Sequence, residues 1–241
     1  MEVASLLVSD LDFTLLGDDR ALEEFANWYE TRRLVLRLVY ASGRFYESIV
    51  ESIRSTALPE PVAVIADVGT DIRWYESGAS VTGWREQWTS CWDARRVRAE
   101  LTRFSLLRLQ AEAFQSDYKV SYFATNATDV LLRDVGRALQ EASLSANLIY
   151  SSNRDLDVVP TGANKGTAAA FLARHWGLAE ECVLVRGDSG NDMAMFSRSF
   201  RGIVIANAHP DLKALAGQNV FLSQFAYAHG VLDGVRHWLG N

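Results

Sequence analysis

The chain of 241 residues has only two cysteines, Cys91 and Cys182. Their spacing matches neither a zinc site nor a disulfide framework, so we expect two reduced thiols, as is usual in the cytoplasm. No apolar run approaches the roughly 20 residues that a membrane span needs. The first residues, "MEVASLLVSD", also lack the basic segment that opens a secretory signal peptide. These absences indicate a cytoplasmic protein with no membrane partner.

Basic residues are in the minority, since 24 Lys and Arg stand against 30 Asp and Glu and give a net charge of −6. A nucleic-acid surface needs a basic stripe, so we expect no nucleic-acid partner. The net charge does not exclude a small anionic substrate, because local fields decide that. A hydrophobic content of 49% and a charged content of 22% are typical of a soluble globular enzyme with a substantial core.

Both ends of the sequence alternate between strand and helix patterns. Residues 3–10 form a continuous apolar run, as in a parallel strand that is buried on both faces. Similar strands are expected within 34–44, 61–75, 182–189 and 201–207, with helices between them. This alternation predicts an α/β fold with a doubly wound parallel sheet.

The middle of the chain has a different pattern. Two segments, 118–126 and 146–160, predict strands of a smaller sheet, and two helices are expected beside them. We therefore expect a catalytic core of residues 1–77 and 160–241 with an inserted α+β cap of residues 78–159. Three tryptophans at helical spacing near the start of this insertion predict a helix packed into a core, namely Trp84, Trp88 and Trp92.

Four segments place polar groups at expected strand ends or helix starts. Asp10 and Asp12 end the first strand, and Ser42-Gly43-Arg44 ends the second. Asn164-Lys165-Gly166 opens a helix, and "GDSGND", residues 187–192, ends a later strand. Ligands of open α/β sheets bind at the carboxyl ends of the strands, so these segments are expected to meet there.

The four segments carry complementary chemistry. Hydroxyl, backbone amide and ammonium groups at 42–44 and 164–166 suit phosphate oxygens. The carboxylates and the amide of 187–192 suit a hard cation such as Mg²⁺. Each segment alone is also common as a solvated turn or helix cap. Together they predict a phosphoryl-transfer site.

The motifs "DLDFT", "SGR", "NKG" and "GDSGND" resemble those of the haloacid dehalogenase superfamily of Mg²⁺-dependent phosphatases. With "YKVSYF", "YSSNRDLDVVPTGANKG", "RGIVIANAHP" and "HGVLDGVRHWL", the whole chain is similar to the sucrose-phosphate phosphatase family. This resemblance implies a Rossmann-like core with an inserted α/β cap of type C2B.

The resemblance implies a role for each core residue. Asp10 would be the nucleophile that forms an aspartyl-phosphate, and Asp12 the general acid and base. Mg²⁺ would be held by Asp10, the backbone carbonyl of Asp12, and Asp188, with Asn191 and Asp192 behind them. The phosphate oxygens would be bound by Ser42, Gly43, Lys165 and Asn191.

The cap of the family recognises the sugar, and the matching cap positions are Gln115, Lys119, Ser121, Tyr122, Arg154, Asp155 and Asp157. Thr70 and Asp71, on a hairpin of the core beside the site, are also expected to contact the sugar. The alternative for Lys119, Ser121 and Arg154 is a solvated sheet face. Phe13 departs from the family, where Gly or Asn is common, and a bulky ring there is expected to reshape the entrance of the site. Ser42 replaces the usual Thr but keeps the hydroxyl.

The sequence therefore predicts a Mg²⁺-dependent phosphatase of a phosphorylated disaccharide, sucrose 6-phosphate or a relative such as mannosylfructose phosphate. Its partner would be the glycosyltransferase that makes the substrate. Within the fold, a phosphosugar mutase or a phosphatase of another small sugar phosphate stays open. A phospho-accepting signalling domain and a catalytically silent sugar-binding protein are weaker alternatives.

Overall fold

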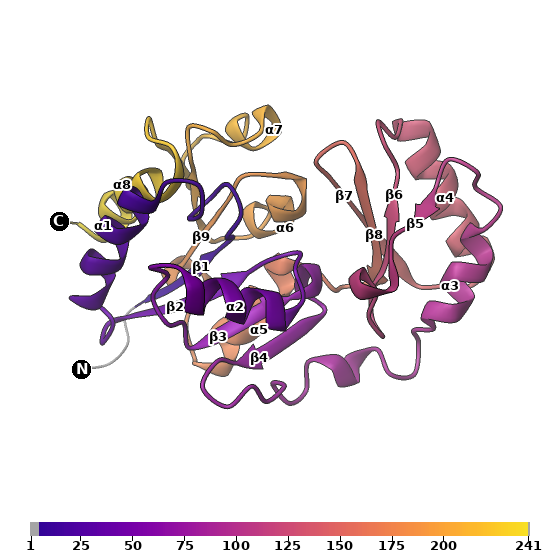
Figure 1. Cartoon of the computed structure of the whole chain (residues 1–241), viewed down its shortest axis with the longest axis horizontal. Coiled ribbons are helices and arrows are strands. Elements are labelled where there is room, and N and C mark those ends of the chain that lie inside the picture. The colour runs from indigo at the N-terminus through magenta and orange to yellow at the C-terminus, as the bar shows by residue number, and fades with distance from the viewer. Residues whose placement is uncertain (1–4, 241) are drawn as a thin grey trace.

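The computed structural model describes residues 5–240 and contains two sheets (Figure 1). The larger sheet has seven strands in the order β11-β10-β9-β1-β2-β3-β4, parallel except for β4. These strands are β1 (Ser5–Ser9), β2 (Leu36–Ala41), β3 (Ala63–Ala66), β4 (Asp71–Trp74), β9 (Val183–Gly187), β10 (Arg201–Val204) and β11 (Val220–Leu222). The chain leaves β1 in one direction towards β2 and later returns on its other side as β9, so a topological switch point lies at β1.

Helices cover both faces of the large sheet. Along β1, Leu7 packs into the cluster formed by α1 (Asp19–Glu30), α2 (Tyr46–Ser55) and α8 (Tyr227–Leu239). The alternate side chains of Leu6 and Val8 pack into the opposite cluster, beside α5 (Lys165–His175) and α6 (Met193–Phe196). Both sides of β1 are thus buried, which explains its continuous apolar sequence. The short helix α7 (Pro210–Lys213) follows β10.

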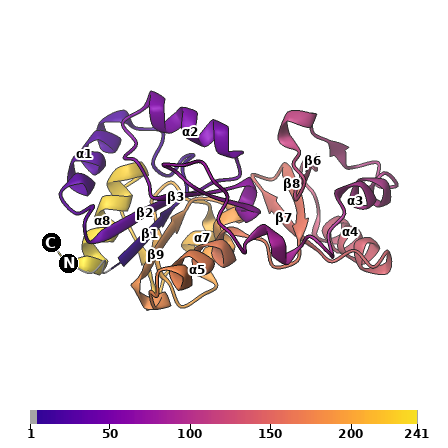
Figure 2. The same cartoon turned by 90° about the horizontal axis from the view of Figure 1, so that it is seen from below.

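The smaller sheet is antiparallel, with the order β5-β6-β8-β7. Its strands are β5 (Arg108–Leu109), β6 (Val120–Phe123), β7 (Ala146–Ser151) and β8 (Asp155–Pro160). Two amphipathic helices, α3 (Ala94–Leu101) and α4 (Asp129–Glu141), pack on one face and form a separate core with it. The other face is turned towards the large sheet, as Figures 1 and 2 show.

The predicted fold class is confirmed: a parallel α/β core carries an inserted α+β unit. The boundaries at 77/78 and 159/160 stay a prediction, and β8 extends to Pro160. One expected element is wrong, because Trp84 and Trp88 lie in turns around a single 3₁₀ turn at Arg85–Gln87 rather than on an α-helix. Both indoles are nevertheless buried, as expected for core residues, and each N–H donates to a backbone carbonyl that is distant in the sequence, that of Gly69 or Thr161.

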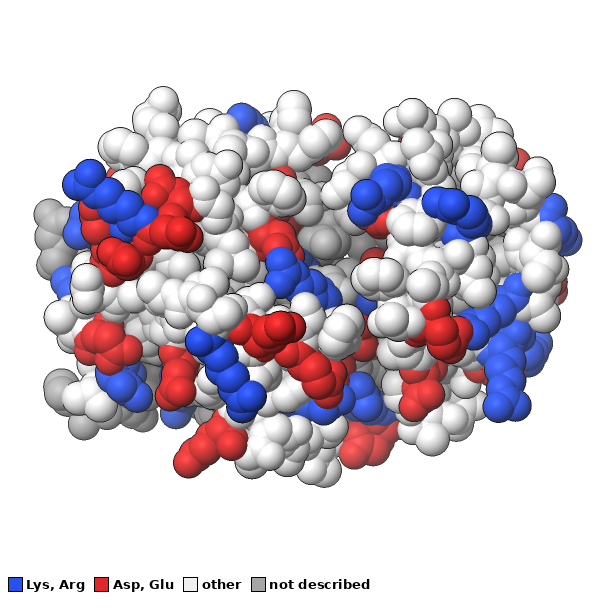
Figure 3. Space-filling model, viewed as in Figure 1, with Lys and Arg blue, Asp and Glu red and all other residues white. Residues whose placement is uncertain are grey.

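Charges of both signs are scattered over the face seen in Figure 3, with a hollow between the parts built on the two sheets. Among residues 5–240, no helix combines the length and the apolar character that crossing a membrane requires.

Candidate active site

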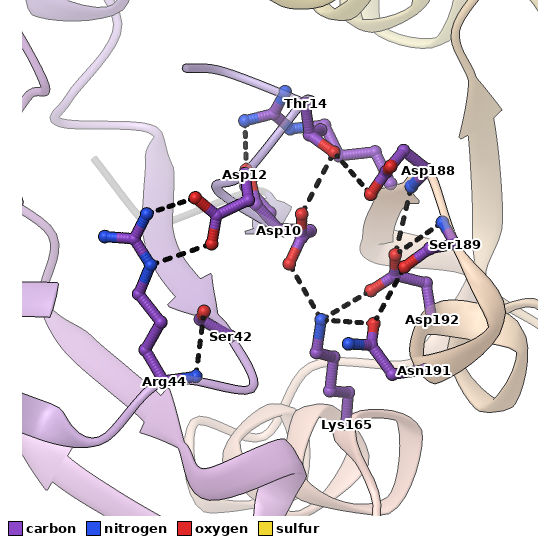
Figure 4. A network of polar contacts seen from close by, with 12 residues as sticks. Asp10, Asp12, Thr14, Ser42, Arg44, Lys165, Asp188, Ser189, Asn191 and Asp192 are labelled. Atoms are coloured by element: carbon purple, nitrogen blue, oxygen red, sulfur yellow. Dashed lines mark hydrogen bonds and ion pairs between the residues drawn. The ribbon is translucent and has the colours of Figure 1, made fainter. Parts of the chain in front are cut away.

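The four polar segments meet at the carboxyl edge of the large sheet, as Figure 4 shows. Lys165 is the centre of this cluster, because its Nζ lies 2.8 Å from Asp10 Oδ1, 2.7 Å from Asp192 Oδ1 and 2.8 Å from Asn191 Oδ1. These residues follow β1, open α5 and follow β9, so they are far apart in the sequence. The expected convergence of the segments is therefore present in the structure.

Local sequence explains why Lys165 points to this place. Asn164 is the N-cap of α5, and its side chain accepts the N–H of Thr167 at 2.8 Å while Thr167 Oγ1 accepts the Asn164 N–H at 3.2 Å. This capping box fixes the first turn of the helix. Lys165 is fully buried, which requires ionic partners. Although burial lowers its pKa, the carboxylates of Asp10 and Asp192 more than offset that effect and raise it above the usual value.

Asp192 organises the turn after β9. Its Oδ2 accepts the backbone N–H groups of Asp188 at 3.0 Å and Ser189 at 3.1 Å, while Oδ1 accepts from Lys165. Gly187 makes room for this carboxylate, since a Cβ there would lie 2.1 Å from Asp192 Cγ. Asp192 thus holds the loop and the lysine in place, and Asp188 faces the open side of the cluster.

The cluster carries more negative than positive charge. Oxygens of Asp10, Asp188 and Asp192 lie within 4.8 Å of one another around a single ammonium. Burial, then Asp10 and Asp192, raise the pKa of Asp188 to about 7, and burial above all raises the pKa of Asp192 to about 6. Close carboxylates that resist ionisation are stabilised by a cation, and oxygen donors suit Mg²⁺. The residues therefore fit a divalent cation, with Asp10 and Asp188 best placed to hold it.

Asp12 lies beside the cluster in a bidentate ion pair with Arg44. Arg44 Nε donates to Asp12 Oδ2 at 2.8 Å, the guanidinium also pairs with Oδ1, and Nη1 donates to Ser52 Oγ at 2.8 Å. Ser42 is buried behind this pair, where its Oγ accepts the N–H of Arg44 at 3.2 Å. Arg44 belongs to the motif "SGR", but nothing in the sequence indicates that it contacts Asp12.

Two further residues were missed by the sequence analysis. Thr14 Oγ1 lies 3.1 Å from Asp10 Oδ2 and 3.5 Å from Asp188 Oδ1, so its hydroxyl lies between the two carboxylates. Arg186 is fully buried beneath them and hydrogen-bonds to Ser9 Oγ. A Thr four residues after an Asp is a recognisable signal, whereas an arginine inside an apolar strand gives no sign of what it contacts.

A cavity of about 520 Å³ opens above the cluster and has walls from both sheets. The predicted site residues that line it are Asp10, Asp12, Ser42, Gly43, Lys119, Ser121, Arg154, Asp155, Asp157, Asp188 and Asn191. Lys165 and Asp192 are fully buried beneath the cavity floor. Exposed aromatic rings in the wall were not proposed as ligands, namely Phe13, Phe45 and Phe114.

Two of the three polar residues of the cap sheet that could form a solvated face are instead buried in specific contacts. Lys119 and Ser121 are buried, and Ser121 Oγ donates to Asp157 Oδ1 at 2.5 Å. Lys119 Nζ reaches the core, where it lies 2.8 Å from Asp67 Oδ1 and 3.1 Å from the carbonyl of Gly43. Only Arg154 of the three is exposed, and it pairs with Asp155 at 2.8 Å.

Four residues proposed to bind sugar lie away from this cavity, and one of them, Tyr122, is buried in the core between the small sheet and its helices. Thr70 and Asp71 are buried in the β3–β4 hairpin, where Asp71 pairs with Arg73 at 2.8 Å and Arg85 at 3.0 Å. Burial raises the pKa of Asp71. Gln115 bonds to the backbone of Ser121 through both ends of its amide, so it braces the cap.

Comparison with known proteins finds relatives that match this chain over nearly its whole length. The sequence model of the sucrose-6F-phosphate phosphohydrolase family matches residues 3–239. Mannosylfructose-phosphate phosphatase of Agrobacterium fabrum is 34% identical over 99% of this chain and 98% of its own length. Sucrose-phosphatase 1 of Nicotiana tabacum is 33% identical over 97% of this chain, which spans only 59% of that longer protein.

Solved structures agree with these relatives. The sucrose-phosphatase of Synechocystis sp. PCC6803, determined with sucrose and phosphate, superposes with a TM-score of 0.92 at 30% identity and covers 99% of this chain and 98% of its own. A haloacid dehalogenase-like hydrolase of Bacillus subtilis has a TM-score of 0.72 at 17% identity over 100% of this chain and 93% of its own, which supports the fold alone. The chain is thus a phosphoric monoester hydrolase, and it belongs to the sucrose-6F-phosphate phosphohydrolase family.

Proposed function

We propose that the chain is a Mg²⁺-dependent phosphatase of a phosphorylated disaccharide, sucrose 6-phosphate or a close relative such as mannosylfructose phosphate. The observation that carries this proposal is the cavity of about 520 Å³, which has Asp10 and Asp12 at its floor and polar cap residues in its wall. Its volume lies in the range of about 300–1,000 Å³ that is usual for small-molecule sites. The names of the relatives supply the class of sugar phosphate.

In the first step, a carboxylate oxygen of Asp10 attacks phosphorus, and the bond from phosphorus to the sugar oxygen breaks. Asp12, which must first leave its ion pair with Arg44 and take up a proton, gives that proton to the leaving oxygen. In the second step, a water attacks the aspartyl-phosphate, Asp12 takes the water proton, and Asp10 is regenerated together with free phosphate. Asp12 suits both tasks because it is directly exposed to the cavity next to Asp10.

The surrounding residues make an anionic nucleophile compatible with an anionic substrate. Lys165 neutralises Asp10 from below, and Ser42 with the amides of its loop would bind phosphate oxygens from the side. Mg²⁺ held by Asp10, Asp188 and the carbonyl of Asp12 would supply positive charge that stabilises the transferring phosphoryl group. Asn191 and Asp192 would support that site from behind, since both already hold Lys165.

Residues of the cap would bind the sugar part of the substrate. Ser121, Asp155 and Asp157 offer hydrogen-bond donors and acceptors in the cavity wall, and Arg154 lies at its exposed edge. Lys119 also lines the cavity, although its ammonium is engaged by Asp67. Thr70, Asp71 and Gln115 would act only indirectly, because their side chains are occupied by contacts outside the cavity.

A screen for released phosphate tests the proposal. The purified chain is given Mg²⁺ and sucrose 6-phosphate, mannosylfructose phosphate, glucosylglycerol phosphate or single-ring sugar phosphates. We expect the highest kcat/KM with a disaccharide phosphate. Isomerised sugar phosphate without free phosphate would instead identify a mutase, and a preference for single-ring esters would identify a phosphatase of another small sugar phosphate.

We also infer that the partner of the chain is the glycosyltransferase that makes its substrate. A relative named glucosylglycerol-phosphate synthase, from Pseudomonas anguilliseptica, is 30% identical over 97% of this chain, which corresponds to 30% of that longer protein. Co-purification of the chain with a glycosyltransferase whose product it hydrolyses would support this partnership. The expected cytoplasmic location stays a prediction.

A further inference from the structure

Phe13 combines two unfavourable properties in one residue. Its φ is 55°, in the left-handed region where a bulky L-residue is strained. Its side chain is 66% exposed, so burial of the ring provides no compensation. Strained residues of this kind persist where the surrounding structure holds them, and they gather at functional sites.

The surroundings of Phe13 hold its backbone firmly. Asn207 Nδ2 donates to the Phe13 carbonyl at 2.6 Å, and Asn207 Oδ1 accepts the N–H of Tyr227 at 3.0 Å. On the other side, the carbonyl of Leu11 accepts the N–H groups of residues 14, 15 and 16 at 3.2, 3.0 and 2.9 Å. The tight turn that follows Asp12 is therefore fixed from both directions, and the ring of Phe13 projects from a rigid base.

The ring of Phe13 lines the catalytic cavity, directly after Asp12 in the sequence. The cap contributes a second exposed ring to the same cavity, Phe114, which is 51% exposed. Sugar rings have polar hydroxyl edges and apolar C–H faces. The cap residues Ser121, Asp155 and Asp157 suit the edges, whereas an aromatic face suits the C–H groups.

We propose that Phe13 is a specificity-determining residue, whose ring covers the C–H face of the sugar that carries the leaving oxygen. The chain then favours phosphate esters of ring sugars over esters of open-chain polyols. This inference rests on the proposed function, because it places the sugar beside Asp12. It deepens that function by assigning sugar selection to the core as well as to the cap.

The test compares sucrose 6-phosphate, which has sugar rings, with glycerol 3-phosphate, which has none. Both esters need a proton on the leaving oxygen, so they differ in ring contacts but share the demand on Asp12. In Phe13→Asn the KM for sucrose 6-phosphate should rise about fivefold with kcat nearly unchanged, as expected for a contact kept from ground state to transition state. The constants for glycerol 3-phosphate should stay within about twofold. Because Asn tolerates a positive φ, the thermal midpoint should not fall.

Two further variants make the comparison specific. Phe13→Tyr keeps the ring and should restore a near-normal KM. Phe225→Ala removes another exposed phenylalanine, which is 55% exposed and lies outside the catalytic cavity. This control should leave KM and kcat for both substrates unchanged. If Phe13→Asn lowered kcat without raising KM, or affected both substrates equally, the ring would only position Asp12 and the inference would be wrong.

The proposed function fails separately from this inference. If the wild-type chain released no phosphate from either sucrose 6-phosphate or mannosylfructose phosphate, the disaccharide assignment would be wrong. The comparison is then made with the sugar phosphate that the wild type hydrolyses best. An unchanged KM for that ester in Phe13→Asn overturns the inference, and a raised KM supports it.

Discussion

The ammonium of Lys119, on the cap, lies 2.8 Å from the carboxylate of Asp67, on the core, and both side chains are buried. Lys119 also donates to the carbonyl of Gly43, next to Ser42. This ion pair therefore couples the small sheet to the loop proposed to bind phosphate. Asp67 itself has a φ of 50°, and its N–H donates to the carbonyl of Arg44, so it is held rigidly from the core side.

Removing Lys119 should have a large effect. Lys119→Met leaves the Asp67 carboxylate buried without its cation, which typically costs about 3 kcal/mol of unfolding free energy. Chemical denaturation measures this loss, and the KM should rise because the cap wall of the cavity is held less firmly to the core. The double variant Lys119→Met/Asp67→Asn should recover most of the stability. Lys213→Met, in helix α7, is the matched control, and an equal loss there would argue against the ion pair.

The two carboxylates after β1 should be separable by substitution. Asp10→Asn removes the nucleophile and should lower kcat at least about 10³-fold. Asp12→Asn removes the general acid and base and should lower kcat by about 10²–10⁴-fold. Circular dichroism should find both variants folded. Asp134→Asn, on the outer helix α4, should keep full activity, and near-normal turnover in either site variant would refute the assigned role.

Divalent cations should control both activity and stability. Chelation with EDTA should stop phosphate release, and added Mg²⁺ should restore it, because the acidic cluster needs a cation. Mg²⁺ should also raise the thermal midpoint, since a ligand that binds only the folded state stabilises it. Asp188→Asn should weaken that rise. Full activity in excess chelator, or a thermal midpoint that is the same with and without Mg²⁺, would contradict the metal site.

Asp157 should give the stability a distinctive pH dependence. Burial raises its pKa, although Lys119 and the hydrogen bond from Ser121 act in the opposite direction. A raised carboxyl pKa means that the folded state binds the proton more tightly than the unfolded state does. The ionised carboxylate therefore destabilises the folded state at neutral pH, and this destabilisation disappears as the pH falls towards about 4, the usual pKa of an aspartic acid. Wild type should therefore gain stability relative to Asp157→Asn on acidification. A constant difference between the two would contradict this assignment.

Much of the site follows from local sequence. Asp10, Ser42 and Asp188 each end a parallel strand, and strand ends of one sheet meet at one edge, so their convergence could be predicted without coordinates. Lys165 could be placed because Asn164-Lys165-Gly166 is expected to open a helix, and Asn164 is indeed the N-cap of α5. The continuous apolar run of residues 3–10 likewise predicted a buried parallel strand, and β1 (Ser5–Ser9) is one.

Other features depend on packing between the two sheets and could not be predicted. The ion pair of Lys119 with Asp67 joins residues from different sheets, and no sequence pattern encodes that distance. The expected tryptophan helix was wrong because the indoles of Trp84 and Trp88 donate to distant carbonyls, which holds the chain in turns. The left-handed backbone of Phe13 is held by local bonds to the Leu11 carbonyl and also by Asn207, which is far along the chain.

In the proposed reaction, Asp10 takes the phosphoryl group from the sugar before water does. Acid quenching of a single turnover, with radiolabelled phosphate on sucrose 6-phosphate and Mg²⁺ present, tests it most directly. We expect transient label on the peptide that contains Asp10 in the wild type and no labelled protein in Asp10→Asn. Phosphate release at the full rate without labelled protein, or label that persists in Asp10→Asn, would contradict it.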